Sequence, residues 1–287
     1  MDLKPTVQGG MIYLTMAFWV IALILATIGL IITIIGLLNK RASKFQKPFS
    51  ILTHILFFAG FLISLVAWIY RWIHVQHLPM QNLFEVFLTL GMLIWPIWLF
   101  SWRVLGIRSL VSDILIGWIV LFPAGLVFSA DPQRLPPALQ SWLFAPHVAV
   151  YMISYVFMAK AMVQAVLVYV YGFFSASDKL YARMIEAERG TYRMVRIGFP
   201  LLTLGLLLGS VWGQRAWGDY WGWDPKELWS LASWLVYIGY FHFRFLYGTR
   251  HPRINSVWAV MGLVFIIITL VWVNLSRIFP GLHNYAT

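Results

Sequence analysis

Residues 212–230 read WGQRAWGDYWGWDPKELWS, a polar segment between two long apolar runs. It contains five tryptophans within eighteen residues, interleaved with Gly213, Gly218 and Gly222. Amphipathic indole rings are ordinary at a membrane edge, but this density exceeds that of a plain interfacial belt, which is the alternative interpretation. Glycines let a backbone lie close to a flat partner, and the rings supply a broad apolar face. The segment therefore predicts a loop that binds a large, planar, aromatic ligand.

The composition of the chain indicates an integral membrane protein. Hydrophobic residues make up 61% and charged residues 11%, whereas about 25% of a typical soluble domain is charged. Apolar runs near or above the ~20 residues that cross a bilayer recur along the whole length. No repeat or soluble domain interrupts them, so we predict one all-α membrane domain over residues 1–287. Eight spans are expected: Met11–Leu38, Ile51–Ile73, Leu83–Trp102, Val111–Phe128, Trp142–Phe174, Ile197–Trp212, Lys226–Tyr247 and Ser256–Leu275.

The distribution of basic residues predicts the orientation. Fourteen of the 21 Lys and Arg residues fall in alternate loops, and six fall on the opposite side. The richer loops are 40–47, 103–108, 179–196 and 244–253. Because such loops stay cytoplasmic, both termini and residues 212–230 are expected to face outward. The net charge of +11 then reflects topology and anionic lipid, and it does not indicate nucleic-acid binding, because no soluble module presents the charges.

The seven histidines fall at two depths in this topology. His242 lies eighteen residues beyond Asp224, which is about 27 Å along a helix and close to the hydrocarbon thickness. His54 is expected at a similar depth, and His251 lies in a cytoplasmic loop. The outer group comprises His74, His77, His147 and His283. The alternatives are two ligand sites at two depths, or one site and several structural histidines.

The exit from the Trp-rich segment predicts a well-capped helix. Asp224 can cap it, Pro225 suits its first turn, and Glu227 completes a capping box. The dipole of such a helix favours an anion at its start by roughly 0.3–1 kcal/mol. Arg215 and Lys226 add positive charge nearby. The expected ligand is therefore flat, apolar and carboxylate-bearing.

Haem has these properties and also needs one or two imidazole ligands. His147 and His283, both on the outer side, are the candidate axial ligands. Hydrogen-bonded structural roles for these histidines are the alternative. The other candidate binding residues are Trp212, Arg215, Trp217, Tyr220, Trp221, Trp223 and Asp224.

The run WGDYWGWDPKELWS closely resembles the WWD signature of haem-handling proteins in cytochrome c maturation. Its DPKE continuation, followed by a helix ending in FHFR at 241–244, is similar to the CcsA/ResC family, the multispan subunits of the System II cytochrome c synthase. The segment HLPMQNLFE at 77–85 resembles the family's H-x-P-x-x-N-x-x-E pattern, and FPGLH at 279–283 resembles the segment with its second external histidine. The resemblance covers roughly Gln76 to the end.

This resemblance implies a path with two haem sites. Haem b, held non-covalently, would bind His242 and a histidine of a CcsB/ResB-type partner, then pass to His147 and His283 on the Trp-rich platform. There its vinyl groups would meet the CxxCH thiols of apocytochrome c, so the chain would be a component of a holocytochrome c synthase. The chain has no cysteine. The thiols would therefore come from the substrate, kept reduced by other maturation proteins.

Several alternatives stay open at this point. The chain could be a haem exporter or chaperone that performs no attachment, a transporter of another aromatic molecule, or a structural subunit of an electron-transfer complex. A bacterial plasma (inner) membrane is expected because no transit peptide precedes the first span, with a thylakoid as the alternative.

Three further features carry open roles. Residues 175–196 have apolar positions at helical spacing, which predicts an amphipathic helix on the cytoplasmic face or a partner-docking surface. Lys160, inside a span, could guide haem carboxylates, but snorkelling to the interface is slightly favoured. His54 and His77 are expected to be structural, although His77 could contact haem.

Overall fold

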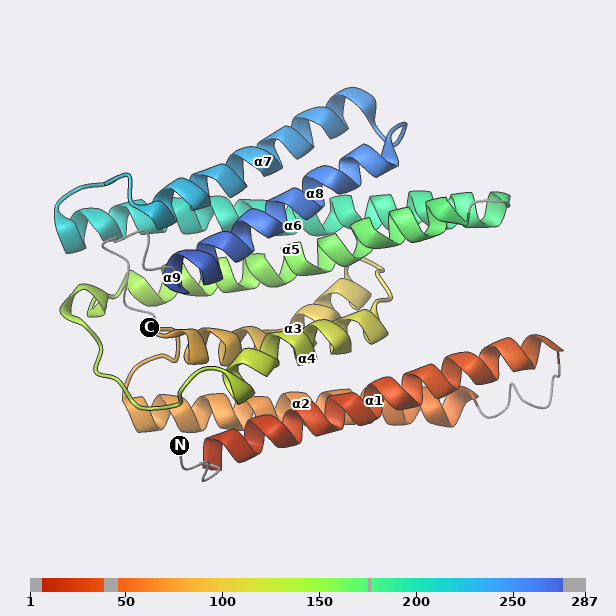
Figure 1. The fold of residues 1–287 in the computed structure, drawn as a ribbon, viewed down its shortest axis with the longest axis horizontal. Helices are drawn as coiled ribbons and strands as arrows, with labels where there is room; N and C mark the ends of the chain where they lie inside the picture. Colours follow the sequence, from red (N-terminus) through yellow and green to blue (C-terminus); the bar gives the residue numbers. More distant parts are fainter. Residues whose placement is uncertain (1–6, 39–45, 175–176, 276–287) are drawn as a thin grey trace. The chain divides into compact units, whose positions relative to one another are not determined.

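The computed structural model describes residues 7–38, 46–174 and 177–275 of this chain (Figure 1). Over these ranges the regular elements are all helices, which confirms the all-α class. Six helices are long and apolar enough to cross a membrane by length and composition, which supports a polytopic membrane protein. Their spanning portions are Val7–Gly29, Lys47–Val75, Leu83–Arg103, Phe144–Phe173, Asp178–Trp217 and Pro252–Leu275.

Each of the eight predicted spans falls on a helix. The two outside the set of six are α4 (Leu110–Leu126), an apolar helix of 17 residues, and α7 (Pro225–Tyr247), a helix of 23 residues. An untilted α4 is slightly short for the ~20 residues that a bilayer requires. The count of eight therefore stays a prediction that depends on these two helices.

The described helices form two compact units. The first contains α1 (Val7–Leu38), α2 (Gln46–Val75), α3 (Leu83–Arg103) and α4. The second contains the short η2 (Pro137–Leu139), α5 (Phe144–Phe173), α6 (Asp178–Trp217), α7, α8 (Pro252–Ile267), η3 (Ile268–Trp272) and α9 (Val273–Leu275). Both units consist of helices, so the division adds no soluble domain, and a single membrane domain over residues 1–287 stays a prediction.

In the first unit, α1 packs along α2 and α3 along α4 (Figure 1). The fully buried indole of Trp19 on α1 lies against Gly60 of α2 and Gly117 of α4. A Cβ atom at either glycine would lie 2.1 or 2.4 Å from this ring. The Trp19 indole N–H donates to the carbonyl oxygen of Phe57 at 3.3 Å. One large side chain thus fills the space that two glycines leave between three helices.

A buried ion pair closes one end of the first unit. The Arg71 Nε donates to Glu85 Oε1 at 2.9 Å, and both side chains are 1% exposed or less. Arg71 also donates to the carbonyl oxygens of Ala130 and Asp131. A buried charge pair is stable only when such additional hydrogen bonds satisfy it. The pair therefore fixes the ends of α2 and α3 to the segment after α4.

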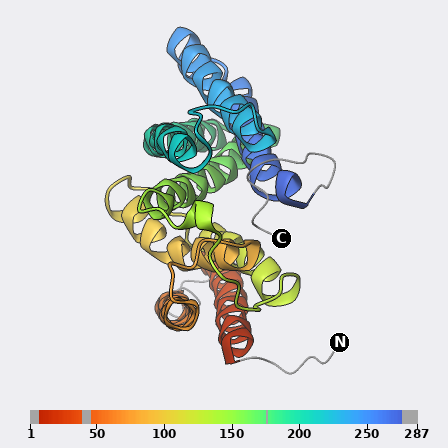
Figure 2. The same cartoon turned by 90° about the vertical axis from the view of Figure 1, so that its left-hand side faces the viewer.

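In the second unit, α5 and α6 form the most extensive contact, and α8 packs on both α5 and α7. Figure 2 gives a view along these helices. The α5 face of α6 carries Gly190, Gly198, Gly205 and Gly209. A Cβ at any of them would lie within 3.0 Å of an α5 side chain. These glycines therefore permit the close approach of the two helices.

No helix end separates residues 178–196 from the predicted span Ile197–Trp212. The two segments belong to α6, one helix of 40 residues from Asp178 to Trp217. The Ser177 side chain caps its start by accepting from the Leu180 N–H, and Gly218, with a φ of 92°, ends it in the left-handed region. Neither Gly190 nor Pro200 breaks the helix between these caps. A surface or docking role for residues 175–196 stays a prediction.

The Trp-rich loop is shorter than the sequence suggested. Trp212, Arg215 and Trp217 belong to the last turns of α6, and the connection to α7 comprises only residues 218–224. The polar residues at 214 and 215 looked like loop residues, but they are exposed positions on a helix that continues to its glycine cap. Helix geometry therefore fixes part of the predicted platform.

Candidate functional site

His147 lies in the first turn of α5 and faces α6. Its Nδ1 is 2.9 Å from the carbonyl oxygen of Gly205. A carbonyl oxygen can only accept, so Nδ1 carries the proton and the lone pair of the neutral ring is on Nε2. The ring stacks on Trp212, with centroids 5.7 Å apart and 24° between planes, and lies edge-on to Tyr151 at 5.0 Å. The contacts define both the ring plane and the tautomer.

Trp212 joins α6 to the segment before α5. Its side chain is almost fully buried, and its indole N–H donates to the carbonyl oxygen of Ala138 at 3.0 Å. Trp217 lies nearly edge-on to it, with centroids 4.8 Å apart. The buried residues around it are Leu139, Leu143 and Phe144. Trp212 is thus a core residue that also presents its ring to His147.

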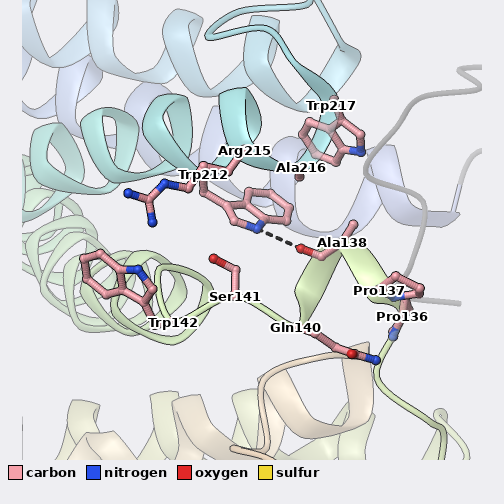
Figure 3. Close-up of a pocket in the computed structure, with 10 residues that line it drawn as sticks. All are labelled: Pro136, Pro137, Ala138, Gln140, Ser141, Trp142, Trp212, Arg215, Ala216 and Trp217. Atoms are coloured by element: carbon pink, nitrogen blue, oxygen red, sulfur yellow. Dashed lines mark hydrogen bonds between the residues drawn. The ribbon is translucent and has the colours of Figure 1, made fainter.

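An open cavity of about 720 Å³ lies beside Trp212 (Figure 3). It brings together Trp212, Arg215 and Trp217 of the predicted site. The guanidinium of Arg215 lies 5.5 Å from the ring centroid of the exposed Trp142. The remaining lining residues are Pro136, Pro137, Ala138, Gln140, Ser141 and Ala216. Aromatic faces with one cation suit a flat apolar ligand that carries a carboxylate.

The connection between α6 and α7 presents two aromatic side chains to the outside, Tyr220 and Trp223. Trp223 has a φ of 56°, in the left-handed region that a bulky residue rarely adopts. Glu227 Oε2 accepts from the backbone N–H groups on both sides of Trp223, those of Gly222 at 2.9 Å and Asp224 at 3.1 Å. One carboxylate oxygen therefore holds the strained residue from both sides.

Asp224 caps α7 as predicted. Its side chain accepts from the N–H of Lys226 at 2.9 Å, and the reciprocal bond from its own N–H to Glu227 completes the capping box. The half-buried Trp221 packs edge-on to Trp223, with centroids 6.0 Å apart. Because α7 begins at Pro225, the positive end of its dipole lies next to these two tryptophans.

His242 lies in the C-terminal half of α7, separated from Asp224 by uninterrupted helix. The predicted separation of about 27 Å along the helix axis therefore holds. His242 is exposed, and it shares one helical face with the exposed apolar residues Leu235, Ile238 and Phe245. The structure does not bring it together with His147. His283 lies outside the described residues.

A buried polar cluster beside His242 was missed by the sequence analysis. Arg244, predicted in a loop, belongs to the last turn of α7, and its Nε lies 2.5 Å from Oε1 of the fully buried Glu188. Its Nη2 donates to Glu188 Oε2 at 3.1 Å, and Asn255 donates to Oε1 at 2.8 Å. The sequence signal that could have indicated this cluster is Glu188, an acidic residue at an apolar position of an amphipathic helix.

Three other residues with open roles occupy defined environments. Lys160 is 2% exposed. A side chain that snorkels to the interface would be exposed at its charged end, so the slightly favoured snorkelling interpretation is wrong. His54 lies near its helix start, with Nδ1 2.7 Å from the carbonyl oxygen of Ser50, as expected for a structural histidine. His77 Nδ1 lies 3.0 Å from the Leu78 carbonyl oxygen, and its Nε2 is buried without a hydrogen-bond partner in the described part of the chain.

Comparison with known sequences defines the class of protein. The family described as "Cytochrome C assembly protein" matches residues 49–280, most of the chain. This chain belongs to that family of membrane proteins, which functions in cytochrome c maturation.

Curated relatives narrow the class to CcsA-type cytochrome c biogenesis proteins. "Cytochrome c biogenesis protein CcsA" of Prochlorococcus marinus subsp. pastoris is 31% identical, over 90% of this chain and 88% of the relative. The protein of the same description from Guillardia theta is 32% identical, over 75% and 79%. These matches bear out the resemblance drawn from the WWD segment.

A solved structure has the same fold. "Cytochrome c Heme Lyase CcmF" superimposes on all of this chain with a TM-score of 0.59 and 17% sequence identity. This chain spans 48% of the length of that protein. At this identity the likeness establishes the fold alone.

Proposed function

We propose that this chain binds haem b as a non-covalent substrate in transit, at the end of the second unit that contains the start of α5, the end of α6 and the start of α7. The observation that carries the proposal is the arrangement of His147. Its Nδ1 donates to a helix carbonyl, so its Nε2 is the nitrogen that binds iron, and its ring stacks on a tryptophan beside a cavity with one arginine. An axial imidazole with an ordered second nitrogen is a usual haem ligand.

Each predicted residue has a role in this proposal. His147 and His283 are the axial ligands, the latter by resemblance to the family. Trp212 and Trp217, together with Tyr220, Trp221 and Trp223, supply apolar contact for the porphyrin. Arg215, Lys226 and the start of α7, which Asp224 caps, offer positive charge to the haem carboxylates.

The finer activity is haem attachment to apocytochrome c. In this step each thiol of a CxxCH motif adds across one vinyl group of haem. The sulfur bonds to one vinyl carbon and the thiol proton ends on the other, so no oxidant is needed. The chain supplies no thiol. Its contribution is to hold the haem where substrate thiols, kept reduced by other maturation proteins, can reach it.

The second haem site is at His242. This exposed histidine, on an apolar face of α7, would share the iron with a histidine of a CcsB/ResB-type partner subunit. Within the second unit the basic residues of 179–196 and 244–253 lie toward the other ends of α6 and α7, which supports an outward orientation of the His147 end. The relatives come from cyanobacteria and plastids, so the membrane is a bacterial plasma membrane or a thylakoid.

The test is an absorption spectrum of the detergent-purified protein, coexpressed with a CcsB/ResB-type partner. We expect the reduced spectrum of haem b in the wild type. His147→Ala should lose most of the outer haem, and a residual signal should disappear on adding His242→Ala. The matched control is His74→Ala, which removes an exposed histidine that stacks on Tyr70 and should leave the spectrum unchanged.

The same preparation separates the alternatives. Thioether formation on a CxxCH substrate, absent with an AxxAH variant, supports attachment. Haem binding without thioether formation supports an exporter or chaperone. If the wild type carries no haem under ample haem supply, the proposal fails and the transporter of another aromatic molecule gains support.

A further inference from the structure

Two glycines of α6, Gly205 and Gly209, leave the space that the His147 ring and its neighbour occupy. An ideal Cβ placed on Gly209 would lie 2.6 Å from Cε1 of His147 and 3.0 Å from Nδ1. One on Gly205 would lie 2.9 Å from the ring of Tyr151, the residue that meets His147 edge-on. Contacts below 3 Å are essentially never made by real Cβ atoms. An alanine at either position therefore requires the aromatic pair to move.

The two glycines also act through one backbone carbonyl. In a helix the carbonyl of residue 205 accepts from the N–H of residue 209. A carbonyl oxygen has a second lone pair, and His147 Nδ1 uses it at 2.9 Å. A Cβ on Gly209 would lie 3.0 Å from the same Nδ1 atom, so a side chain there would crowd the donor of this hydrogen bond. The same glycine thus makes room for both the ring and its hydrogen bond.

A second residue of α6 also fixes the ring. Trp212, three residues beyond Gly209, stacks on the imidazole, and its own N–H is anchored to the Ala138 carbonyl oxygen. His147 therefore packs against both Gly209 and an anchored indole. A flip of the ring by half a turn would lose the hydrogen bond, and a rotation out of its plane would lose the stack as well.

We propose that Gly209, with the carbonyl of Gly205, is a positioning element that sets the plane and the tautomer of His147 before any ligand binds. The part of this inference that concerns haem binding rests on the proposed function. The positioning of the His147 ring by Gly209 is independent of it. A histidine already in its binding tautomer needs no proton shift when it coordinates iron. Removal of such a supporting contact typically lowers metal affinity about 10–100-fold.

The first part of the test uses no haem. The full chain is purified haem-free with ¹⁵N-labelled histidine, and the tautomer of each histidine is read from long-range ¹H–¹⁵N spectra. The His147 signal is assigned by its loss in His147→Gln. We expect the wild-type proton on Nδ1 at neutral pH. We also expect a mixture of tautomers, or a shift toward Nε2–H, in Gly209→Ala.

The matched control is Gly198→Ala, which lies on the same helix and the same face. Its Cβ would meet the flexible end of Met158 at 3.0 Å, so it crowds α5 without touching His147. Gly198→Ala should leave the His147 signal unchanged. A wild-type proton on Nε2, or the same His147 response to both glycine variants, overturns the proposal.

The second part adds haem to the chain with its partner subunit. Gly209→Ala should bind haem at the outer site roughly 10–100-fold more weakly, and added imidazole should restore the low-spin spectrum. The His242-dependent signal should not change. Unaltered outer haem affinity in Gly209→Ala overturns the positioning role. A wild type that shows the Nδ1–H tautomer, responds to Gly209→Ala and binds no haem refutes the proposed function but retains the positioning of His147.

Discussion

The two histidines of the second unit differ in how much of their surroundings the chain itself supplies. His147 is fixed by a helix carbonyl, a stacked indole and an edge-on tyrosine. His242 is exposed on an apolar face of α7 and makes no hydrogen bond or ring contact with the described residues. The surroundings of the first histidine are already formed by the chain, whereas a site at the second would need another molecule to complete it.

Exposure of His242 does not mean that its helix is loosely held. The cluster of Glu188, Arg244 and Asn255 ties the last turn of α7 to α6 and α8, only two residues from His242. The cation of Arg244 also lies 4.8 Å from the ring centroid of Tyr192. Both histidines therefore stand on rigid backbone, and the difference concerns only the side-chain surroundings.

The largest expected effect tests this rigid support. Glu188→Ala leaves Arg244 without its buried partner and should lower the free energy of unfolding by ~3–5 kcal/mol. Denaturant unfolding in detergent, with the chain purified alone, measures it. The control is Glu186→Ala, because Glu186 pairs with Arg193 at 3.3 Å on the exposed surface and should cost less than ~1 kcal/mol. Similar losses for the two variants would show that α7 is not anchored through Glu188.

A smaller effect tests whether the His242 face meets a partner. Phe245, 86% exposed, is the most exposed of the apolar side chains on that face. Phe245→Ala should leave the stability of the chain alone unchanged and lower recovery of the CcsB/ResB-type subunit in copurification by about tenfold, as for a central contact of an interface. The control is Leu207→Ala on α6, which is 61% exposed. Equal recovery with both variants contradicts a partner at the His242 face.

The smallest expected effect separates two properties of Trp223, the strain of its left-handed backbone and the contact that its indole makes with haem. Glycine adopts a φ of 56° without the Cβ clash that an alanine retains. Trp223→Gly should therefore be more stable than Trp223→Ala by ~1 kcal/mol, and both should lose the same outer haem, because both lack the indole. Unfolding curves and haem occupancy of the two variants measure these quantities. Equal stabilities would mean that the left-handed backbone is not strained.

Local sequence signals predicted the helices best where strong start and stop signals flank an apolar run. Leu83 begins a helix and Tyr247 ends one in both the prediction and the structure, and Pro225 lies one residue from the predicted start of its span. The capping box at Asp224 was read correctly because its partners are within three residues.

The features that escaped prediction depend on contacts between residues far apart in the chain. Arg244 looked like a loop cation because its partner Glu188 lies 56 residues away. Trp212 looked like part of a loop because its anchor, the Ala138 carbonyl oxygen, precedes it by 74 residues. The role of Gly209 depends on His147 across a helix interface. No local pattern encodes such pairings.

The continuity of α6 has a consequence for how this chain can vary in length. Glu188 near one end anchors α7, and Gly209 near the other end accommodates His147, with one unbroken helix between them. Each inserted or deleted residue would turn one end relative to the other by about 100° and shift it by ~1.5 Å. Insertions and deletions among relatives should therefore be absent between residues 188 and 209 and collect in the connections between helices.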